Sequence, residues 1–234
     1  MTKTQKVFLA MPTHDGRINS GSAQSLYANN SQVHDVYIKV GTISLLNYNM
    51  NKLWADALNM HEEHPDMKWF AMLHSDVYSE PYWIDKLIEI AEKYQIDMLS
   101  AAVAIKDDSG DTSTGISNPQ NDHWNLKRIS IDQIQLFERD MKVPLSAMAF
   151  DYNQILLANT GCMICRIDKP WSSEVLFKTE ERLHRNGLGH WEAFCDSEDW
   201  NFSRQVHDRG GIVAVTSAVK TWHVGRKVFA NFKD

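Results

Sequence analysis

The sequence contains no apolar run of the 18–20 or so residues that a bilayer-spanning helix requires. Residues 1–6 lead into a short strand-like segment, and no apolar stretch of signal-peptide length follows them. Cysteine is scarce, and Cys162, Cys165 and Cys195 are an odd number without a pairing framework. Such cysteine usage fits a reducing compartment. We therefore expect a cytoplasmic protein with no transmembrane segment.

An excess of basic residues is also lacking. The 234 residues include 24 Lys and Arg against 30 Asp and Glu, which gives a net charge of −6. Stable nucleic-acid binding favours a basic face, so we expect none here, although a local basic patch could hold a phosphorylated small molecule. There is no internal repeat, low-complexity tract or linker. The length suits one large domain.

The first half alternates strand-like and helical patterns. The 3–4 spacing of Met50, Leu53 and Trp54 predicts an amphipathic helix over about 47–60. Ser79 and Pro81 are expected to begin a second helix, as cap and first-turn proline. Strand–helix alternation is typical of an α/β, Rossmann-like domain, with a mostly parallel central sheet and helices on both faces. The predicted strands are 7–11, 36–40, 69–73 and 98–105.

The second half is less regular. Residues 107–111 and 113–121 are polar, contain glycine and are expected to form loops. A long irregular excursion in a domain is usually a lid or binding loop, so we expect 107–125 to be mobile without ligand. An apolar pattern returns over 155–167, interrupted at 159–161, where we expect the backbone to approach another group closely.

Cys162 and Cys165 form a CxxC motif inside that apolar segment. Neither a second CxxC nor a histidine pair accompanies it. Two interpretations remain: a zinc or redox pair, or two thiols packed in the core.

A polar cluster follows the strand at 69–73. His74 and Asp76 stand where open α/β sheets bind ligands, at the carboxyl ends of their strands. Asp76 is a suitable oxygen ligand for Mg²⁺ or Mn²⁺, and His74 is a nitrogen ligand that Mn²⁺ accepts. His223 also ends an apolar strand-like segment and could complete such a site. The structural alternatives are a turn and helix cap at Asp76 and a hydrogen-bonding role for His223.

Two acids open a helix-like segment near the end of the chain. Ser197 is suited to cap this helix, and Glu198 and Asp199 occupy its first turn. Acids there interact favourably with the helix dipole, which is the structural interpretation. The functional interpretation is a general base that removes a proton from a substrate hydroxyl.

Taken in order, these segments resemble a nucleotide-sugar glycosyltransferase of the GT-A type, close to family 2 and similar to small single-domain members from bacteria and phages. The resemblance spans roughly residues 6–228, and no one motif is specific without the others. It implies one GT-A domain over 1–234, with a nucleotide-binding half at about 6–105 and an acceptor-binding and catalytic half at about 106–228. The motifs are residues 11–17, 51–53, 74–77, 159–164, 197–202 and 223–225.

The resemblance also implies roles for individual residues. Asp76 matches the second acid of the family's Asp-x-Asp metal motif, and His223 matches its late metal-binding histidine. Asp199 matches the general base of inverting members, with Glu198 beside it, and the cofactor is Mn²⁺ or Mg²⁺. His74 takes the place of the motif's first acid, where it would bind metal or ribose. The donor-binding positions are Pro12, Thr13, Asp15, Asn51, Lys52, His74, Ser75 and Gly161.

The implied reaction is metal-dependent transfer of a sugar, of the hexosyltransferase type, from a nucleotide-diphosphate sugar such as a UDP-sugar to an acceptor hydroxyl. Many relatives carry arginine where this chain has Met50, so diphosphate neutralisation would fall on the metal and Lys52. The acceptor could be a glycan, a lipid-linked molecule, a protein or a nucleobase. Alternatives are a retaining transferase, a nucleotidyltransferase and a non-catalytic sugar-nucleotide-binding protein. The loop at 13–17 has one glycine, whereas nucleotidyltransferases usually carry a glycine-rich loop there.

Overall fold

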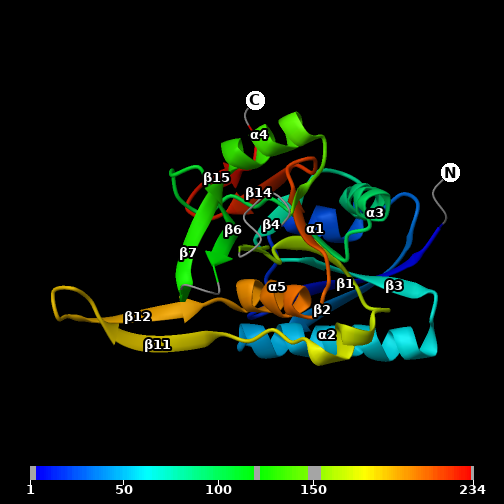
Figure 1. Cartoon of the computed structure of the whole chain (residues 1–234). Helices are drawn as coiled ribbons and strands as arrows, with labels where there is room; N and C mark the ends of the chain where they lie inside the picture. The colour runs from blue at the N-terminus through cyan, green and yellow to red at the C-terminus, as the bar shows by residue number, and fades with distance from the viewer. Residues whose placement is uncertain (1–3, 119–121, 147–153, 233–234) are drawn as a thin grey trace.

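A seven-stranded sheet forms the centre of the protein (Figure 1). The computed structural model describes residues 4–118, 122–146 and 154–232. None of the helices in this part of the chain is both long and apolar enough to cross a membrane. Across the sheet, the strands are β2 (Asp35–Thr42), β1 (Lys6–Thr13), β3 (Met67–Leu73), β10 (Cys162–Arg166), β5 (Met98–Ala101), β13 (Val213–Thr216) and β8 (Leu145–Ser146).

The sheet is mixed, so the expectation of a mostly parallel sheet is only partly right. β2, β1 and β3 pair in parallel, as do β5 and β13. β10 lies between β3 and β5 and is antiparallel to both, and β8 is antiparallel to β13. Parallel neighbouring strands need a crossover connection, usually a single helix. The chain between β5 and β10 instead forms several further strands and α4, and β10 enters the sheet antiparallel to its neighbours.

Helices cover both faces of the sheet, as the sequence predicted (Figure 1). Strand alternation divides β1 between two cores, because successive side chains point to opposite faces. Phe8 packs in the core that includes residues of α2 (Leu46–Glu63) and α5 (Glu198–Asp208). Leu9 packs in the other core, with residues of α1 (Ser20–Tyr27) and α3 (Trp83–Tyr94).

The predicted helix start at Ser79 and Pro81 is wrong. Ser79 ends a short strand, β4 (Val77–Ser79), and α3 begins four residues later at Trp83. β4 pairs with β14 (Thr221–Val224), which also pairs with β15 (Val228–Ala230). Pairing with a distant strand thus outweighs the local capping signal at this position.

The expectation of loops is right for residues 107–110 but wrong for residues 113–118, which form most of a strand. β6 (Asp111–Asn118) lies between β7 (Asp122–Ser130) and β9 (Ile155–Leu157), and α4 (Ile131–Met141) follows β7. The polar residues of β6 are compatible with burial because they are hydrogen-bonded: the Thr112 hydroxyl donates to the Ile129 carbonyl at 2.8 Å. Residues 119–121 and 147–153 of this predicted region lie outside the described residues.

Cys162 and Cys165 lie on β10 and are fully buried. Burial raises the pKa of both thiols above the ordinary value, since a thiolate is costly to hold away from water. This environment supports the interpretation as core thiols rather than reactive ones.

Trp54 of α2 connects helix, sheet and loop. Its ring lies edge-on to Phe70 of β3 and Phe202 of α5, with centroids 5.0 and 5.2 Å away. Its indole N–H donates to the carbonyl of Ser172, in the 3-10 helix η2 (Pro170–Glu174), at 3.1 Å. The side chain is only 3% exposed.

We therefore expect Trp54→Ala to lower the free energy of unfolding by about 3–5 kcal/mol, because it leaves a large cavity and an unpaired carbonyl. Chemical denaturation would measure the loss. Tyr48→Ala, at a 54% exposed position of the same helix, is the control and should change stability by about 0.5 kcal/mol or less. Equal effects of the two changes would contradict this description of the core.

Candidate functional site

Polar loops from separate parts of the chain meet beyond the carboxyl ends of β1 and β3. These strands are parallel, so their following loops lie at the same edge of the sheet. The turn at 74–76 follows β3 directly. The backbone N–H of Asn19, in the loop after β1, donates to the Ser75 carbonyl at 3.1 Å. The segment that follows β1 and the predicted metal motif are therefore in contact.

Asp76 and His223 lie side by side at this edge. The pairing of β14 with β4 places His223 opposite Val77, and the N–H of Val224 donates to the Asp76 carbonyl at 2.8 Å. This register brings His223 Nε2 to 3.6 Å from Asp76 Oδ2. His223 Nδ1 lies 2.8 Å from the carbonyl oxygen of Ala104, which can only accept, so Nδ1 carries a hydrogen.

Lys106 completes this group and was not predicted from the sequence. Its ammonium donates to Asp76 Oδ2, the same oxygen that faces His223. Burial acts to raise the pKa of Asp76, but hydrogen bonds from His223 and Lys106, together with the nearby charge of His74, lower it well below its ordinary value. Asp76 is therefore held as an anion by hydrogen-bond donors, one of which is the Lys106 ammonium.

Asp76 and His223 are two groups that could contribute ligands to a metal ion. Within the described ranges, no three His, Cys, Asp or Glu side chains form a group that could hold a metal ion. Mg²⁺ commonly binds one or two carboxylates and takes its remaining ligands from substrate phosphates and water, and Mn²⁺ accepts imidazole. Asp76 and His223 fit a cation of that kind, which would have to displace the Lys106 ammonium.

His74 faces a different partner. Its Nε2 lies 3.3 Å from the hydroxyl oxygen of Thr160, and that hydroxyl donates its single hydrogen to Asp199 Oδ1. The His74 nitrogen must therefore be the donor in the first contact. The result is a chain of hydrogen bonds from His74 through Thr160 to Asp199, rather than the expected metal-binding set of His74, Asp76 and His223.

Asp199 opens onto a small pocket of about 220 Å³. Ser197 caps α5 by accepting a hydrogen bond from the N–H of Trp200, which confirms its predicted role. The Trp200 indole donates to the Ser113 carbonyl at 2.7 Å, and the Arg128 guanidinium lies over its ring at 5.0 Å. Arg128 lies on β7, beyond the predicted loops, and no sequence pattern indicated it. The pocket is lined by Ser113, Arg128, Cys195, Ser197, Asp199 and Trp200.

Several predicted donor-binding residues already have structural partners. Pro12 and Thr13 end β1 instead of starting a loop, and the Thr13 hydroxyl donates to the Gly41 carbonyl at 2.8 Å. Gly161 lies at the edge, where its carbonyl accepts from the N–H of His74 at 2.9 Å. Asp15 is exposed and accepts from the N–H of Arg17 at 3.1 Å.

Asn51 and Lys52 lie on α2. The Asn51 side chain binds both backbone groups of Phe177, each at 2.7 Å, so its amide fixes the loop before β11. Lys52 is exposed. No contact recorded among the described residues links either one to Asp76 or Asp199.

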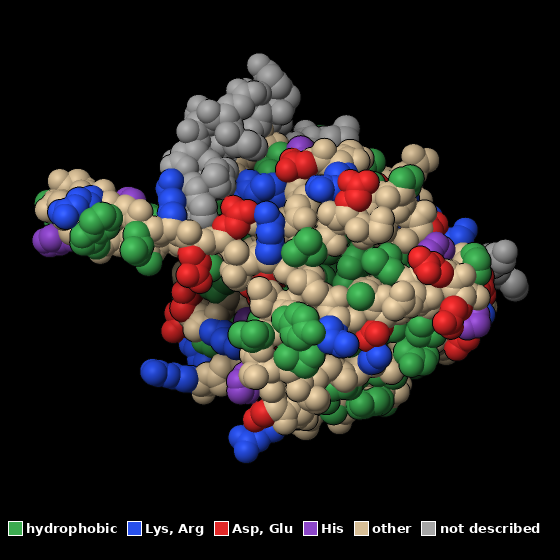
Figure 2. Space-filling model, turned by 90° about the horizontal axis from the view of Figure 1, so that it is seen from below, with side chains coloured by type: hydrophobic (Ala, Val, Ile, Leu, Met, Phe, Trp, Pro, Cys, Tyr) green, Lys and Arg blue, Asp and Glu red, His purple; other side chains and the backbone are tan. Residues whose placement is uncertain are grey.

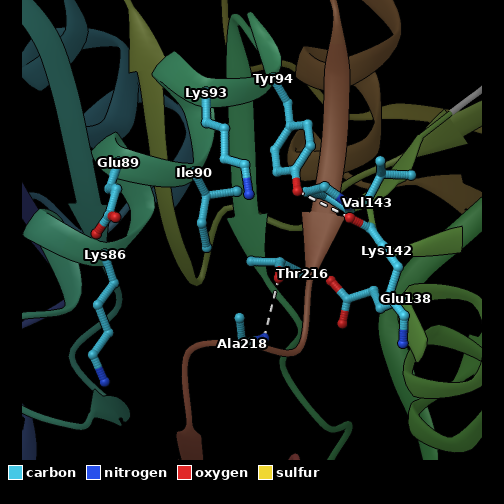
Figure 3. A pocket seen from close by; sticks show the side chains of 11 residues that line it. Lys86, Glu89, Ile90, Lys93, Tyr94, Glu138, Lys142, Val143, Thr216 and Ala218 are labelled. Carbon is cyan, nitrogen blue, oxygen red and sulfur yellow. Dashed lines mark hydrogen bonds between the residues drawn. The ribbon is translucent and has the colours of Figure 1, made fainter.

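A larger cavity lies elsewhere on the molecule (Figure 3). It has a volume of about 450 Å³ and lies between α3 and the end of α4, where the Tyr94 hydroxyl donates to the Lys142 carbonyl at 2.9 Å. None of the residues that line it is a predicted site residue. This cavity is larger than the pocket beside Asp199, but the predicted acid–base residues lie at the sheet edge.

Comparison with known proteins does not place the chain in a family. No family model matches the sequence, and no curated protein is similar to it. Among solved structures, the chain is similar to A197 from STIV, with 13% identity and a TM-score of 0.49 over 98% of this chain and 95% of the other. This likeness is too distant to carry an argument about function.

The two adjacent acids of α5 give a test of the site's electrostatics. Burial, and then the neighbouring carboxylate of Asp199, raise the pKa of Glu198. Because the pKa of Glu198 is higher in the folded state than in the unfolded state, its contribution to the free energy of unfolding is most favourable below the unfolded-state pKa. That contribution is lost as the pH rises through the folded-state pKa.

We therefore expect Glu198→Gln to raise the melting temperature at pH 7 and to leave it unchanged near pH 3.5. Thermal unfolding across this range would measure the difference. Glu63→Gln, at the end of α2, is the control and should show no such pH-dependent gain. A variant less stable than the wild type at pH 7 would mean that the charge of Glu198 is favourable where it lies.

Proposed function

We propose that the protein is a glycosyltransferase that moves a sugar from a nucleotide-diphosphate sugar to an acceptor hydroxyl, with inversion and with Asp199 as general base. One observation carries the proposal: the turn at 74–76 bears two side chains, those of Asp76 and His74, whose hydrogen-bond partners differ. Asp76 is paired with the Lys106 ammonium and faces His223, while His74 is connected through Thr160 to Asp199. Sugar transfer needs such a pair of environments, one for the leaving diphosphate and one for the acceptor proton.

The cationic side would receive the donor. Negative charge builds on the diphosphate as its bond to the sugar breaks, and fixed positive groups stabilise that charge. Lys106 and Asp76 are already paired there, and His223 is fixed by its bond to the Ala104 carbonyl. A bound Mg²⁺ or Mn²⁺, held by Asp76 and His223, would supply further charge neutralisation. Lys106, released from Asp76, would then be free to contact a phosphate oxygen.

The carboxylate side would receive the acceptor. Asp199 borders the small pocket and is fixed by the hydroxyl of Thr160, so one of its oxygens is oriented while the other can accept a proton. Arg128, whose guanidinium lies over the Trp200 ring at the same pocket, would orient hydroxyl or anionic groups of the acceptor. The GT-A resemblance supports this assignment, and UDP is the nucleotide we expect.

The donor side can be tested with the nucleotide alone. We expect UDP or GDP with Mn²⁺ to raise the melting temperature, because a ligand that binds only the folded state stabilises it. Asp76→Ala or His223→Ala should abolish the Mn²⁺-dependent part of this shift. Asp66→Ala and His61→Ala are matched controls, since Asp66 immediately precedes β3 and the ring of His61 also contacts a backbone carbonyl, that of Met67. Undiminished shifts in the Asp76 and His223 variants would show that the site is misplaced.

The base can be tested by removing its ability to accept a proton. Asp199→Asn preserves size, and we expect a loss of about 10²–10⁴ in turnover with the donor that stabilises the protein. Donor affinity should change little, because the donor is held on the Asp76 side. Glu198→Gln is the control, and a larger loss there would move the base by one residue. Near-normal turnover of Asp199→Asn, or a product with retained anomeric configuration, would contradict the inverting mechanism.

A further inference from the structure

A two-stranded arm extends away from the body of the protein (Figures 1 and 2). It consists of β11 (Glu180–Arg185) and β12 (Trp191–Asp196), which pair only with each other among the described strands. A two-stranded hairpin is at best marginally stable in water without a further surface to pack on. Large apolar side chains on such an arm therefore indicate a binding surface.

One face of the arm is apolar and open to solvent. The register sets Leu183 opposite Ala193 and Arg185 opposite Trp191, so these four side chains share a face. Leu183 is 72% exposed and Trp191 is 64% exposed. The Arg185 guanidinium lies 4.6 Å from the centre of the Trp191 ring. The face thus combines apolar area with a cation held directly beside it.

The turn at the end of the arm displays a leucine. The side-chain oxygen of Asn186 accepts hydrogen bonds from the N–H groups of Leu188 and His190, each at 3.0 Å. Gly189 supplies the positive φ of +78° that the turn requires. Leu188 is 82% exposed as a result. A turn ordered by these bonds holds an apolar side chain in water at the farthest point of the arm.

The outer part of the arm is basic, whereas its base is acidic. Residues 182–192 contain two arginines and two histidines against one acid, Glu192, while Glu180, Glu181 and Asp196 lie at the base of the arm. On the second face, Phe194 lies between Arg182 and His184, at 5.5 Å from the guanidinium and 4.4 Å from the imidazole. Figure 2 shows basic, histidine and apolar side chains together on this arm.

We propose that this arm binds the surface of an anionic lipid bilayer. Leu183, Leu188 and Trp191 enter the boundary between headgroups and acyl chains, and Arg185 on the same face contacts lipid phosphates, while Arg182 on the second face adds to the attraction of the arm to anionic lipid. Tryptophan and leucine beside arginine are the combination that such an interface favours. Attraction between basic side chains and anionic lipid then adds to the burial of apolar area. The arm binds lipid independently of the proposed transfer reaction.

A second copy of the chain fits this surface less well. Six residues per strand make a face about 20 Å long and about 10 Å wide, or roughly 200 Å². Stable protein–protein interfaces bury about 800 Å² on each partner. The basic character of the tip also opposes the approach of an identical tip.

Sedimentation with vesicles would test the proposal. We expect the full-length protein to bind phosphatidylcholine vesicles containing 30% phosphatidylglycerol and to bind pure phosphatidylcholine vesicles at least 10-fold more weakly. Arg182→Gln with Arg185→Gln should reduce binding to the anionic vesicles about 30-fold, since each arginine contributes a factor of about five. Leu183→Ser with Leu188→Ser should reduce it at least 10-fold.

Two matched pairs on the body serve as controls. Leu136→Ser with Met141→Ser changes exposed apolar residues of α4, and Lys86→Gln with Lys93→Gln changes basic residues of α3. Neither pair should alter vesicle binding, and circular dichroism should confirm that all variants are folded. Absence of vesicle binding by the wild type would overturn the proposal, as would unchanged binding by folded arm variants. A dimer in light scattering that the leucine variants abolish, without vesicle binding, would assign the arm to a second copy.

Discussion

The antiparallel pairing of β10 with β3 is the constraint on which the candidate site depends. In the register of this pair, Cys162 lies opposite Leu73, and the His74 N–H donates to the Gly161 carbonyl. Because β10 runs against β3, its beginning lies where β3 ends. Residues 159–161 therefore meet the turn at 74–76, and Thr160 can reach both His74 and Asp199. A parallel β10 would have placed Thr160 at the opposite edge of the sheet.

Local patterns in the sequence predicted those parts of the fold that local physics determines. The apolar segments of β1, β2 and β3, the stripe of α2 and the cap at Ser197 follow from periodicity and from hydrogen bonding of neighbouring residues. The strand at Val77–Ser79 and the sheet around β6 depend instead on partners far along the chain. Ser79 and Pro81 carry a helix signal that β14 overrides, and the threonines of β6 look like loop residues until their hydrogen bonds are known.

The candidate site divides in the same way. The sequence predicted that Asp76 and His223 lie close together, but the pairing of β14 with β4, and not a shared edge of the central sheet, brings them there. The contact of His74 with Thr160 depends on the direction of the side chains, which residue spacing does not determine. The same is true of the hydrogen bond from Lys106 to Asp76. Lys106 stands at the start of a polar segment without periodicity. The stem of this lysine passes beside Gly225, where a Cβ would come within 3.2 Å of its Cδ.

In the free protein, the positive charge of Lys106 lies directly beside the carboxylate of Asp76. A partly desolvated carboxylate is stabilised by nearby hydrogen-bond donors, and Lys106 and His223 provide them for the half-buried Asp76. Any incoming cation must compete with an internal one, so binding of a cation and of an anionic diphosphate should be mutually dependent. The free protein can then keep Asp76 ionised and oriented at little cost in stability.

The exposed arm and helix α5 share one attachment point. β12 ends at Asp196, which is fully buried and paired with Arg204 of α5 at 3.1 Å, and Ser197 then caps the helix that carries Asp199. The arm is thus anchored to the same helix turn that aims the carboxylate. The Asp196–Arg204 pair therefore fixes both the base of the arm and the start of the helix that carries Asp199.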